Sequence, residues 1–390
     1  MPHYGDFQNL IYGAGLQGIV PKLPVDFATL EARATAAMPP QVLTYVQGGC
    51  GDEHTQRWNA DAFRQWGMVP RMMVGTTHRD LSVELFGLKL PSPLFMAPIG
   101  VTGICTQDGH GDLAAARAAA ATGVPLTAST LSNDPLEDVK AACGDVPAFF
   151  QLYTPRDTGV AESLVARAEA AGYSALVVTL DTWVTGWRPR DLNVANFPQL
   201  RGAVLQNYFT DPAFRKLLAK PPEQDPAAAI GTWGANFARA MTWDDLKWLK
   251  SVTRMPIALK GICHPDDARR AVDEGADAIY VSNHGGRQAN GGIAAIDHLP
   301  GVVAAAGDVP VLFDSGVRSG SDLVKALALG ARAVGLGRPY AYGLALDGAA
   351  GCAHVLKCVL AEADLLMAVN GYPTIDAVRA AGATRMPPLP

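Results

Sequence analysis

The sequence predicts a closed (β/α)8 barrel of the TIM type, and three observations favour it. From residue 93 onward, the 390-residue chain repeats a short apolar run, a polar or glycine turn and a helical segment. The apolar runs are continuous rather than alternating, as in strands of a parallel sheet that is covered on both faces. Eight such units fit a closed barrel better than an open sheet, and residues 93 to about 365 exceed the roughly 250 that such a barrel needs.

Each unit of the repeat can be located along the chain. We expect barrel strands at 93–99, 124–128, 148–152, 175–180, 256–261, 278–282, 310–313 and 333–337. The helical segments between them include "GDLAAARAAAATG", "AESLVARAEAAG", "WDDLKWLKSV", "DDARRAVDEG" and "SDLVKALALG". Several of these segments end in glycine, the residue that a helix C-terminus prefers.

Two segments lie outside the repeat. Residues 1–92 hold a helical stretch, "FATLEARATAAMPPQVLTYVQGG", and a hairpin pattern, "LSVELFGLKLPSP", which is expected to close the barrel floor. A proline-rich, charged insertion at 182–241 follows the fourth strand, and loops of this length are usually lids or disordered segments. We therefore expect an N-terminal extension at 1–92, a barrel at 93–370 with a lid at 182–241, and a tail at 371–390.

Composition and charge exclude several classes of protein. The formal net charge is -5 and no basic block occurs, so nucleic acid and anionic membranes are not expected partners. The longest uncharged stretch, 90–107, contains Pro91, Pro93 and Pro98 and is not a membrane span. The first residues lack a signal-peptide pattern, and the 6 cysteines are far apart without CxxC pairing. We expect a cytoplasmic protein with reduced thiols.

Polar residues gather where the predicted strands end, which is where barrels of this type carry catalytic groups. The eight ends read "MAPIG", "TAST", "FQLY", "TLDT", "LKG", "SNHGGRQ", "DSGVRSG" and "GLGRP". The last two combine glycines with Arg318 and Arg338, at the loops that often hold phosphate in this fold. Ordinary glycine turns with two unrelated arginines are the simpler alternative, but the same combination in both loops favours a phosphate site.

The loop "SNHGGRQ" carries the most reactive combination. His284 titrates near neutral pH and can serve as a general base, and Arg287 offers a planar pair of donors to a carboxylate. Asp181, at the end of strand four, can orient the imidazole, and Lys260, at the end of strand five, would bring a positive charge into a dry pocket. Such residues in a loop are often only solvated surface, but the flanking glycines and neighbouring strand ends favour an active site.

Two other patterns carry no function. "GAGLQG" at 13–18 matches the dinucleotide fingerprint, but two prolines follow where a helix must begin, so we interpret it as a glycine turn. The remaining histidines show no HxH or HExxH spacing, so no metal site is expected. His110, in "DGHGD", is expected to begin the first barrel helix.

The run "SNHGGRQ", with "LKG" before it and "DSGVR" and "GRP" after it, resembles the FMN-dependent α-hydroxy acid oxidases and dehydrogenases. The resemblance extends from about residue 45 to about residue 370, and its histidine–arginine signature is highly specific. Further matches are most similar to the lactate 2-monooxygenase branch of that family: "GGCGDEHTQR", "APIGV", "DGHGD", "GWRPRDL", "SNHGGRQANGG" and the long fourth loop.

The resemblance implies how the substrate is held. His284 is expected to take a proton from the substrate, with Asp181 as its charged partner. Arg287 and Tyr45 are expected to bind the substrate carboxylate, with Arg188 close behind. Tyr153 is expected to bind the substrate hydroxyl.

The resemblance also implies FMN as the cofactor. Lys260 is expected beside the N1–C2 carbonyl edge of the flavin, where it stabilises the anionic reduced ring. The isoalloxazine and ribityl chain are expected to lie against Ala97, Pro98, Ile99, Gly100, Ser129, Gln151, Thr179 and Ser282. The ribityl and phosphate end is expected at Asp314, Gly316, Arg318, Gly337 and Arg338.

Two positions depart from patterns common in the family. Gly100 stands where many oxidases have alanine, and Leu131 stands where the plant enzymes have a large aromatic residue. A missing methyl group beside the flavin is expected to change how tightly product and oxygen are held over the ring. Leu131 and the small residues near the flavin also favour a short substrate over mandelate.

The resemblance therefore implies oxidation of L-lactate by dioxygen, with decarboxylation of the retained pyruvate to acetate, carbon dioxide and water. An L-2-hydroxy acid oxidase that releases pyruvate and hydrogen peroxide is the alternative. A flavin- or phosphate-binding barrel without redox turnover is a more remote one, and a metal-dependent hydrolase lacks the ligand cluster that it needs. The family pattern also implies a homo-oligomer, a tetramer or an octamer.

Overall fold

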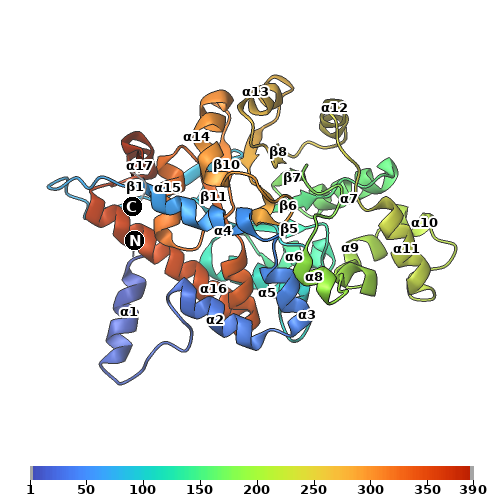
Figure 1. Cartoon of the computed structure of the whole chain (residues 1–390), viewed down its shortest axis with the longest axis horizontal. Helices are drawn as coiled ribbons and strands as arrows, with labels where there is room; N and C mark the ends of the chain where they lie inside the picture. The colour runs from blue at the N-terminus through green and yellow to red at the C-terminus, as the bar shows by residue number, and fades with distance from the viewer. Residues whose placement is uncertain (1–2, 387–390) are drawn as a thin grey trace.

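Eight parallel strands close into a barrel at the centre of the computed structural model, which describes residues 3–386 (Figure 1). Each strand pairs with the next along the chain, and the last, β11, pairs back with the first, β4. The strands β4 to β11 are Leu94–Met96, Leu126–Ser129, Ala148–Leu152, Ala175–Thr179, Ile257–Lys260, Ala278–Val281, Val311–Phe313 and Ala333–Leu336. The (β/α)8 barrel predicted from the sequence is confirmed.

The first barrel strand departs most from its prediction. The sequence predicts 93–99, but β4 ends at Met96. The Ala97 N–H still donates to Leu336 O at 2.9 Å, whereas Pro98 has no N–H to continue the ladder. The other seven strands agree with their predictions to within one or two residues at either end. Residues 97–100 are therefore loop, at the carboxyl end of the first barrel strand.

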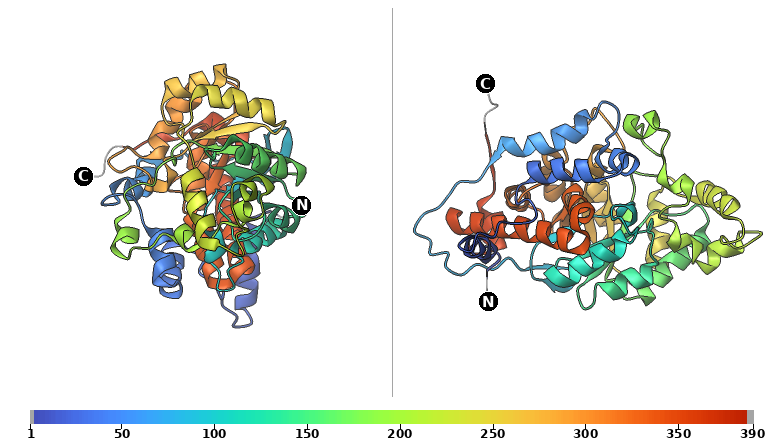
Figure 2. Two further views of the ribbon diagram at one scale, coloured as in Figure 1. Left: turned by 90° about the vertical axis from the view of Figure 1, so that its right-hand side faces the viewer. Right: turned by 90° about the horizontal axis from the view of Figure 1, so that it is seen from below.

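Helices cover the outside of the barrel (Figure 2). They are α5 (Gly111–Thr122), α6 (Leu136–Ala142), α7 (Thr158–Ala170), α12 (Trp243–Val252), α13 (Pro265–Asp273), α14 (Ala295–Ala306), α15 (Gly320–Ala328) and α16 (Arg338–Asn370). His110 directly precedes α5, as predicted, and Gly123 ends that helix with φ 74°, a backbone conformation that glycine adopts without strain. Five buried alanines in α5 allow it to pack closely on α16.

The interior of the barrel is filled by aromatic side chains. Phe95 lies edge-on to Phe149 and Tyr280, with ring centroids 6.3 and 5.6 Å apart. At the amino end, the hairpin of β2 (Val83–Leu85) and β3 (Leu88–Leu90) places Phe86 against Phe149, 5.4 Å between centroids. Since the interior is packed and a hairpin lies at the amino end, a ligand site belongs at the carboxyl ends of the strands.

The N-terminal extension is helical before the hairpin. It contains α1 (Asp6–Gly15), α2 (Phe27–Ala37), α3 (Pro40–Gln47), α4 (His54–Asp61), the 3-10 turn η1 (Ala62–Gln65) and β1 (Trp66–Gly67). The prediction of a glycine turn over all of "GAGLQG" is wrong, because residues 13–15 are the last turn of α1. Only the end of the motif turns, with Gly18 at φ 74°. Figure 1 shows α1 standing away from the barrel.

The insertion after β7 is folded rather than disordered. It forms short helices on one side of the barrel: α8 (Pro189–Asn193), η3 (Pro198–Arg201), α9 (Gln206–Phe209), α10 (Pro212–Lys216) and α11 (Pro226–Asn236). Tyr208 packs edge-on against Phe214 and Trp233, and all three side chains are buried. Asp211 caps α10 and accepts a hydrogen bond from Arg167 of α7 at 3.1 Å. This aromatic cluster and these polar contacts give the insertion its own small core.

The chain returns to the N-terminal extension after α16. Helix α17 (Ile375–Ala381) is followed by β12 (Thr384–Arg385), which pairs antiparallel with β1. The ends of the predicted extension and tail, residues 1–2 and 387–390, lie outside the described residues. The other short 3-10 turns are η2 (Thr102–Ile104) and η4 (His284–Gly286). Among residues 3–386, every helix is too short or too polar to cross a lipid bilayer.

Candidate active site

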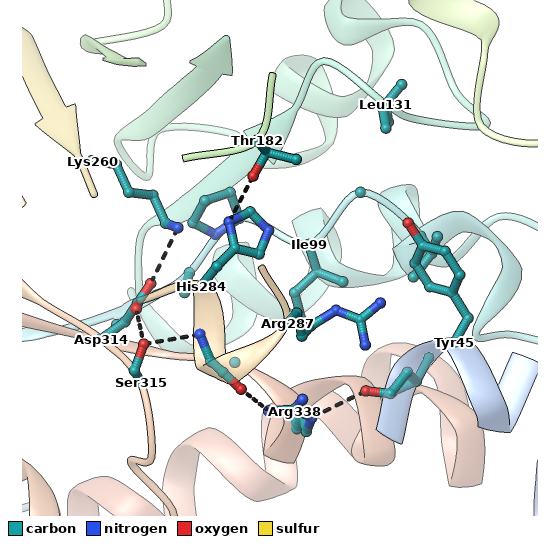
Figure 3. Close-up of a pocket in the computed structure, with 18 of the residues that line it drawn as sticks. Tyr45, Ile99, Leu131, Thr182, Lys260, His284, Arg287, Asp314, Ser315 and Arg338 are labelled. Carbon is teal, nitrogen blue, oxygen red and sulfur yellow. Dashed lines mark hydrogen bonds and ion pairs between the residues drawn. The ribbon is translucent and has the colours of Figure 1, made fainter. Parts of the chain in front are cut away.

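A cavity opens where the carboxyl ends of the strands, the N-terminal extension and the lid meet (Figure 3). Most of the residues predicted to hold cofactor or substrate line it: Tyr45, Ala97, Pro98, Ile99, Gly100, Tyr153, Arg188, Lys260, His284, Arg287, Asp314, Gly316, Arg318, Gly337 and Arg338. The barrel therefore brings together, in one place, groups as far apart in the chain as Tyr45 and Arg338.

Five predicted residues stand behind the lining instead: Ser129, Gln151, Thr179, Asp181 and Ser282. Ser129 Oγ donates to Gln151 Oε1 at 2.9 Å, and Gln151 Nε2 donates to Thr179 Oγ1 at 2.9 Å. This buried row ties the tips of β5, β6 and β7 together. The contact of these three side chains with the flavin stays a prediction.

His284 is held in a strained turn at the end of β9. Its φ of 57° lies in the left-handed region, which costs about 1–3 kcal/mol for a residue with a side chain. The His284 N–H donates to Ser282 Oγ at 3.1 Å, and the Gly285 N–H donates to Ser315 Oγ at 3.0 Å. These two hydroxyls hold the turn and keep the imidazole in the cavity wall (Figure 3).

The imidazole has two oxygen neighbours. His284 Nδ1 lies 2.9 Å from Asp181 Oδ1 and 3.1 Å from Thr182 Oγ1, and Thr182 Oγ1 donates to Asp181 Oδ1 at 2.9 Å. With the proton on Nδ1 between these acceptors, Nε2 is the basic nitrogen.

Electrostatics favour a neutral imidazole beside a charged carboxylate. Burial lowers the pKa of His284, Asp181 opposes this, and Lys260 reinforces it, so that the pKa lies below its usual value. Burial acts to raise the pKa of Asp181, but His284 and Lys260 outweigh it and hold that pKa well below its usual range. At neutral pH, the pair is therefore a base ready to accept a proton next to a fixed negative charge.

Lys260 and Asp314 lie side by side at the edge of the cavity. The Lys260 side chain is 3% exposed, and its Nζ lies 4.0 Å from Asp314 Oδ2. Asp314 also accepts hydrogen bonds from Tyr280 (2.8 Å), Ser282 (2.5 Å) and Ser315 (2.8 Å). The Asp314 oxygens are thus largely occupied by protein groups, whereas the ammonium keeps donors for a negatively charged ligand atom.

On the opposite wall, the guanidiniums of Arg188 and Arg287 lie over the ring of Tyr45. The Tyr45 ring centroid lies 4.8 Å from the Arg287 Cζ and 5.5 Å from the Arg188 Cζ. Burial acts to raise the pKa of Tyr45, but the two guanidiniums outweigh it and lower that pKa. Arg287 Nη1 donates to Gly48 O, while its buried Nη2 has no partner among residues 3–386. An unpartnered guanidinium N–H at a cavity suits a ligand carboxylate.

Tyr153 completes this wall from the end of β6. Its side chain is buried, and burial raises the pKa of the phenol, which therefore stays protonated at neutral pH. Its ring packs against Phe237 of the lid, 5.2 Å between centroids. A protonated phenol can both donate to and accept from a ligand hydroxyl.

The other end of the cavity suits a phosphate. Helix α16 begins at this end of the cavity, with Arg338 as its first residue and Gly337 directly before it. The N-terminus of a helix attracts anions. Gly316, at φ 88°, lies so close to the N-terminal extension that a Cβ would be 2.1 Å from Asn59 O. Arg318 lies over the Phe27 ring at 4.7 Å, and among residues 3–386 its guanidinium makes no hydrogen bond.

Arg338, by contrast, is already bound to protein. Its guanidinium donates to Val46 O (3.1 Å), Gly285 O (3.2 Å) and Gln56 Oε1 (2.5 Å). Of the two predicted phosphate ligands, Arg318 is therefore the freer one. The buried Lys260 ammonium, the available Arg318 guanidinium and the helix N-terminus together fit an elongated anion such as FMN, with the flavin beside Lys260.

Sequence reasoning missed several lining residues, and one group of them lies in the lid. Phe197, Gln199, Trp233 and Phe237 close the cavity from that side, and Gln199 Nε2 donates to Tyr45 Oη at 3.1 Å. No strand end or repeat marks them in the sequence. Gln56, Thr182 and Ser315 were also missed, although each lies within or beside a motif that the sequence analysis used.

Among the described residues, no three histidine, cysteine, aspartate or glutamate side chains are grouped to hold a metal ion. The arrangement instead offers a base, a carboxylate-binding cluster and a buried ammonium around one cavity. That combination suits removal of hydrogen from an acid substrate next to an organic cofactor.

Comparisons with known proteins agree with this geometry. A profile of the family described as FMN-dependent dehydrogenase matches residues 34–384. The chain is 40% identical to an FMN-dependent alpha-hydroxy acid dehydrogenase of Penicillium citrinum, over 96% of this chain and 94% of the relative. It is also 40% identical to an L-lactate oxidase of Lysinibacillus sphaericus, over 91% and 92%.

Among solved structures, a protein described as a lactate oxidase from Pediococcus acidilactici superposes with a TM-score of 0.83 at 36% identity, covering 93% of this chain and 95% of that one. The chain is an enzyme that uses FMN to oxidise α-hydroxy acids, and it belongs to the FMN-dependent α-hydroxy acid oxidase and dehydrogenase family.

Proposed function

We propose that the chain is a lactate 2-monooxygenase, which converts L-lactate and dioxygen into acetate, carbon dioxide and water. FMN, when bound, would supply the two-electron redox chemistry by which lactate is oxidised to pyruvate and dioxygen is reduced to hydrogen peroxide. The peroxide then attacks the retained pyruvate: the carbon–carbon bond to the carboxylate breaks, the peroxide O–O bond breaks, and acetate, carbon dioxide and water result. One dioxygen is consumed for each lactate.

The observation that supports the oxidation step is the convergence of a base and a carboxylate-binding cluster in one cavity. We assign the substrate carboxylate to the unpartnered Nη2 of Arg287, to Tyr45 and, behind them, to Arg188. Tyr153 orients the substrate hydroxyl. His284 Nε2 takes a proton from the substrate, and the Asp181 carboxylate stabilises the imidazolium that forms.

The wall around the substrate side chain supports a short substrate. Leu131 lies directly beside Gly100 in the cavity wall, since a Cβ on Gly100 would be 3.2 Å from Leu131 Cδ1. Trp233 and Phe237 of the lid pack against each other, 5.2 Å between centroids, and close the same side. A methyl group, as in lactate, fits such a pocket more readily than a phenyl group does.

The folded lid supports retention of pyruvate. Its side chains Phe197, Gln199, Trp233 and Phe237 form one wall of the cavity, and Gln199 is hydrogen-bonded to Tyr45. A product enclosed in this way stays beside the peroxide for longer, which favours decarboxylation over release.

The second candidate is an L-lactate oxidase that releases pyruvate and hydrogen peroxide. The 40% identity to L-lactate oxidases favours it as strongly as the lid favours the monooxygenase. Product analysis after aerobic turnover of L-lactate by the FMN-loaded protein separates the two when catalase is present, because catalase destroys released peroxide before it can decarboxylate free pyruvate in solution. Acetate and carbon dioxide in equal amounts then support the monooxygenase, and pyruvate without acetate replaces it by the oxidase.

The wider context also stays a proposal. A homo-oligomer, tetramer or octamer, is consistent with the exposed apolar side chains of Leu10, Leu16, Val20 and Met73. Dioxygen as the second substrate and a cytoplasmic location stay predictions. A flavin-binding barrel without turnover is tested by anaerobic L-lactate, because such a protein would keep its yellow colour.

A further inference from the structure

Gln288 uses the full hydrogen-bonding capacity of its side chain on residues 181–188, which run from Asp181 after β7 into the first residues of the lid and are here called the lid root. Its Nε2 donates to Asp181 O at 2.8 Å and to Val184 O at 2.7 Å, and its Oε1 accepts from Arg188 Nη2 at 2.6 Å and from the Gly186 N–H at 3.4 Å. A glutamine amide has two donors and two acceptor lone pairs, so none is left for a ligand. Gln288 also stands outside the residues that line the cavity.

These contacts join two parts of the site that follow different strands. Gln288 lies on the loop after β9, next to Arg287, and the lid root follows β7. Arg188 Nε donates to Arg287 O at 3.1 Å, which adds a second link between the two segments. Gly186 packs so closely on the loop that a Cβ would lie 2.7 Å from the main-chain oxygens of Arg287 and Gln288.

We propose that Gln288 is a positioning residue, which fixes the lid root to the loop that carries the base. Through its amide nitrogen it holds the backbone of Asp181, and thereby the carboxylate that faces His284. Through its amide oxygen it holds the guanidinium of Arg188 beside Tyr45. The inference rests on the proposed roles of Asp181 and Arg188. The hydrogen bonds of Gln288 are observed whether or not those roles hold.

Two substitutions distinguish the hydrogen bonds that the Gln288 amide donates from those that it accepts. Gln288→Glu has nearly the same shape and keeps both acceptors for Arg188 and Gly186, but loses both donors to Asp181 O and Val184 O. Gln288→Leu loses all four hydrogen bonds. Gln206→Leu is the matched control, since Gln206 is exposed on α9 of the same lid.

The expected kinetics differ between the two variants. Small displacements of catalytic groups cost up to about a hundredfold in rate. We expect Gln288→Leu to raise KM for L-lactate about tenfold, because Arg188 is released, and to lower kcat about tenfold, because Asp181 moves. Gln288→Glu should lower kcat by a similar factor but leave KM within about threefold, since Arg188 stays held. Gln206→Leu should match the unmodified protein in both.

A second readout does not depend on turnover. In the FMN-loaded protein, amide hydrogen exchange of the lid root should be faster in both Gln288 variants than in Gln206→Leu. In Gln288→Leu, the acid limb of the kcat/KM profile should also move to lower pH, because the Asp181 charge that raises the pKa of His284 is held less firmly.

Exchange and kinetics equal to those of the control overturn the proposal. Faster amide hydrogen exchange of the lid root with unchanged KM and kcat also overturns the positioning role, because the hydrogen bonds of Gln288 would then stabilise the lid root without affecting the reaction. If Gln288→Leu does not fold, Gln288→Glu decides by its loss of kcat at constant KM. Failure of the proposed function is seen separately in the unmodified protein, as release of pyruvate in place of acetate or as absence of L-lactate turnover.

Discussion

His284 Nδ1 lies 2.9 Å from Asp181 Oδ1, although the two residues are 103 positions apart in the chain. One follows β9 and the other follows β7, with β8 between them in the barrel. Their contact therefore depends on the strand order and not on any local motif. Thr182, next to Asp181, bonds to both partners and fixes their geometry.

The pair makes the reaction dependent on pH in a defined direction. Only neutral His284 accepts a proton, and burial lowers its pKa below the ordinary value of 6.5. We expect kcat/KM for L-lactate to rise with pH through a midpoint below 6.5 and then to stay level. A midpoint clearly above that value would contradict the assignment of His284 as the base.

Asp181→Asn tests the partner of the base. The substitution removes the charge that raises the pKa of His284, so the midpoint should move to lower pH still. At the plateau, kcat should fall by about 10^2- to 10^4-fold, because the imidazolium loses its counter-charge. Stopped-flow and steady-state pH profiles measure both effects, and a shift to higher pH would show that Asp181 does not act through His284.

Thr182 should contribute more modestly. Thr182→Val keeps the shape but removes the hydroxyl that bonds to Asp181 and His284. One net hydrogen bond is worth about 1 kcal/mol, so kcat should fall about three- to tenfold. Thr182→Ser restores the hydroxyl and should recover most of the rate. Equal rates for the valine and serine variants would mean that the hydroxyl does not orient the pair.

Arg287 should control affinity for the acid group. Arg287→Lys keeps the charge but loses the second guanidinium nitrogen, Nη2, which is buried without a partner among residues 3–386. We expect KM for L-lactate to rise about 10^2-fold, and the dissociation constant of an unreactive carboxylate to rise by a similar factor. The latter is measured from the change in flavin absorbance on binding. Unchanged carboxylate affinity would place the substrate elsewhere.

Gly100 should influence the fate of pyruvate. In Gly100→Ala, the new methyl group lies 3.2 Å from Leu131 Cδ1, so Leu131 must move and the pocket beside the flavin changes. We expect a larger share of free pyruvate and hydrogen peroxide among the aerobic products. Adding Leu131→Ala removes the contact with Cδ1 but keeps the one with Leu131 Cβ at 3.3 Å, so it should reverse part of the change. The same product ratio in all three proteins would remove the argument from Gly100.

The barrel and the residues at its strand ends could be predicted because their signals are local. A run such as 148–152 is apolar and bounded by turns, and the polar residue after each run marks the site, as with His284 and Lys260. The closure of the barrel then brings these ends together. The strand predicted at 93–99 was too long for a related reason. Hydrophobicity alone would continue it, but Pro98 has no N–H for the hydrogen bonds between strands, and β4 ends at Met96.

The lid could not be predicted in this way. Gln199 and Trp233 lie in an insertion without a repeat, and their place in the cavity wall follows from aromatic packing between distant residues such as Tyr208 and Trp233. The hydrogen bonds of Arg338 could not be predicted either, because those to Val46 O and Gln56 Oε1 exist only once the N-terminal extension is folded over the barrel.

The most direct test of the account mixes the FMN-loaded protein with L-lactate in the absence of oxygen and follows the yellow absorbance of the flavin. We expect rapid bleaching in the unmodified protein and in His78→Ala, which changes an exposed histidine outside the cavity lining. His284→Ala should keep its FMN but bleach about 10^4-fold more slowly, because no base takes the substrate proton. Bleaching of His284→Ala at the unmodified rate, or no bleaching of the unmodified protein, would contradict the central claim.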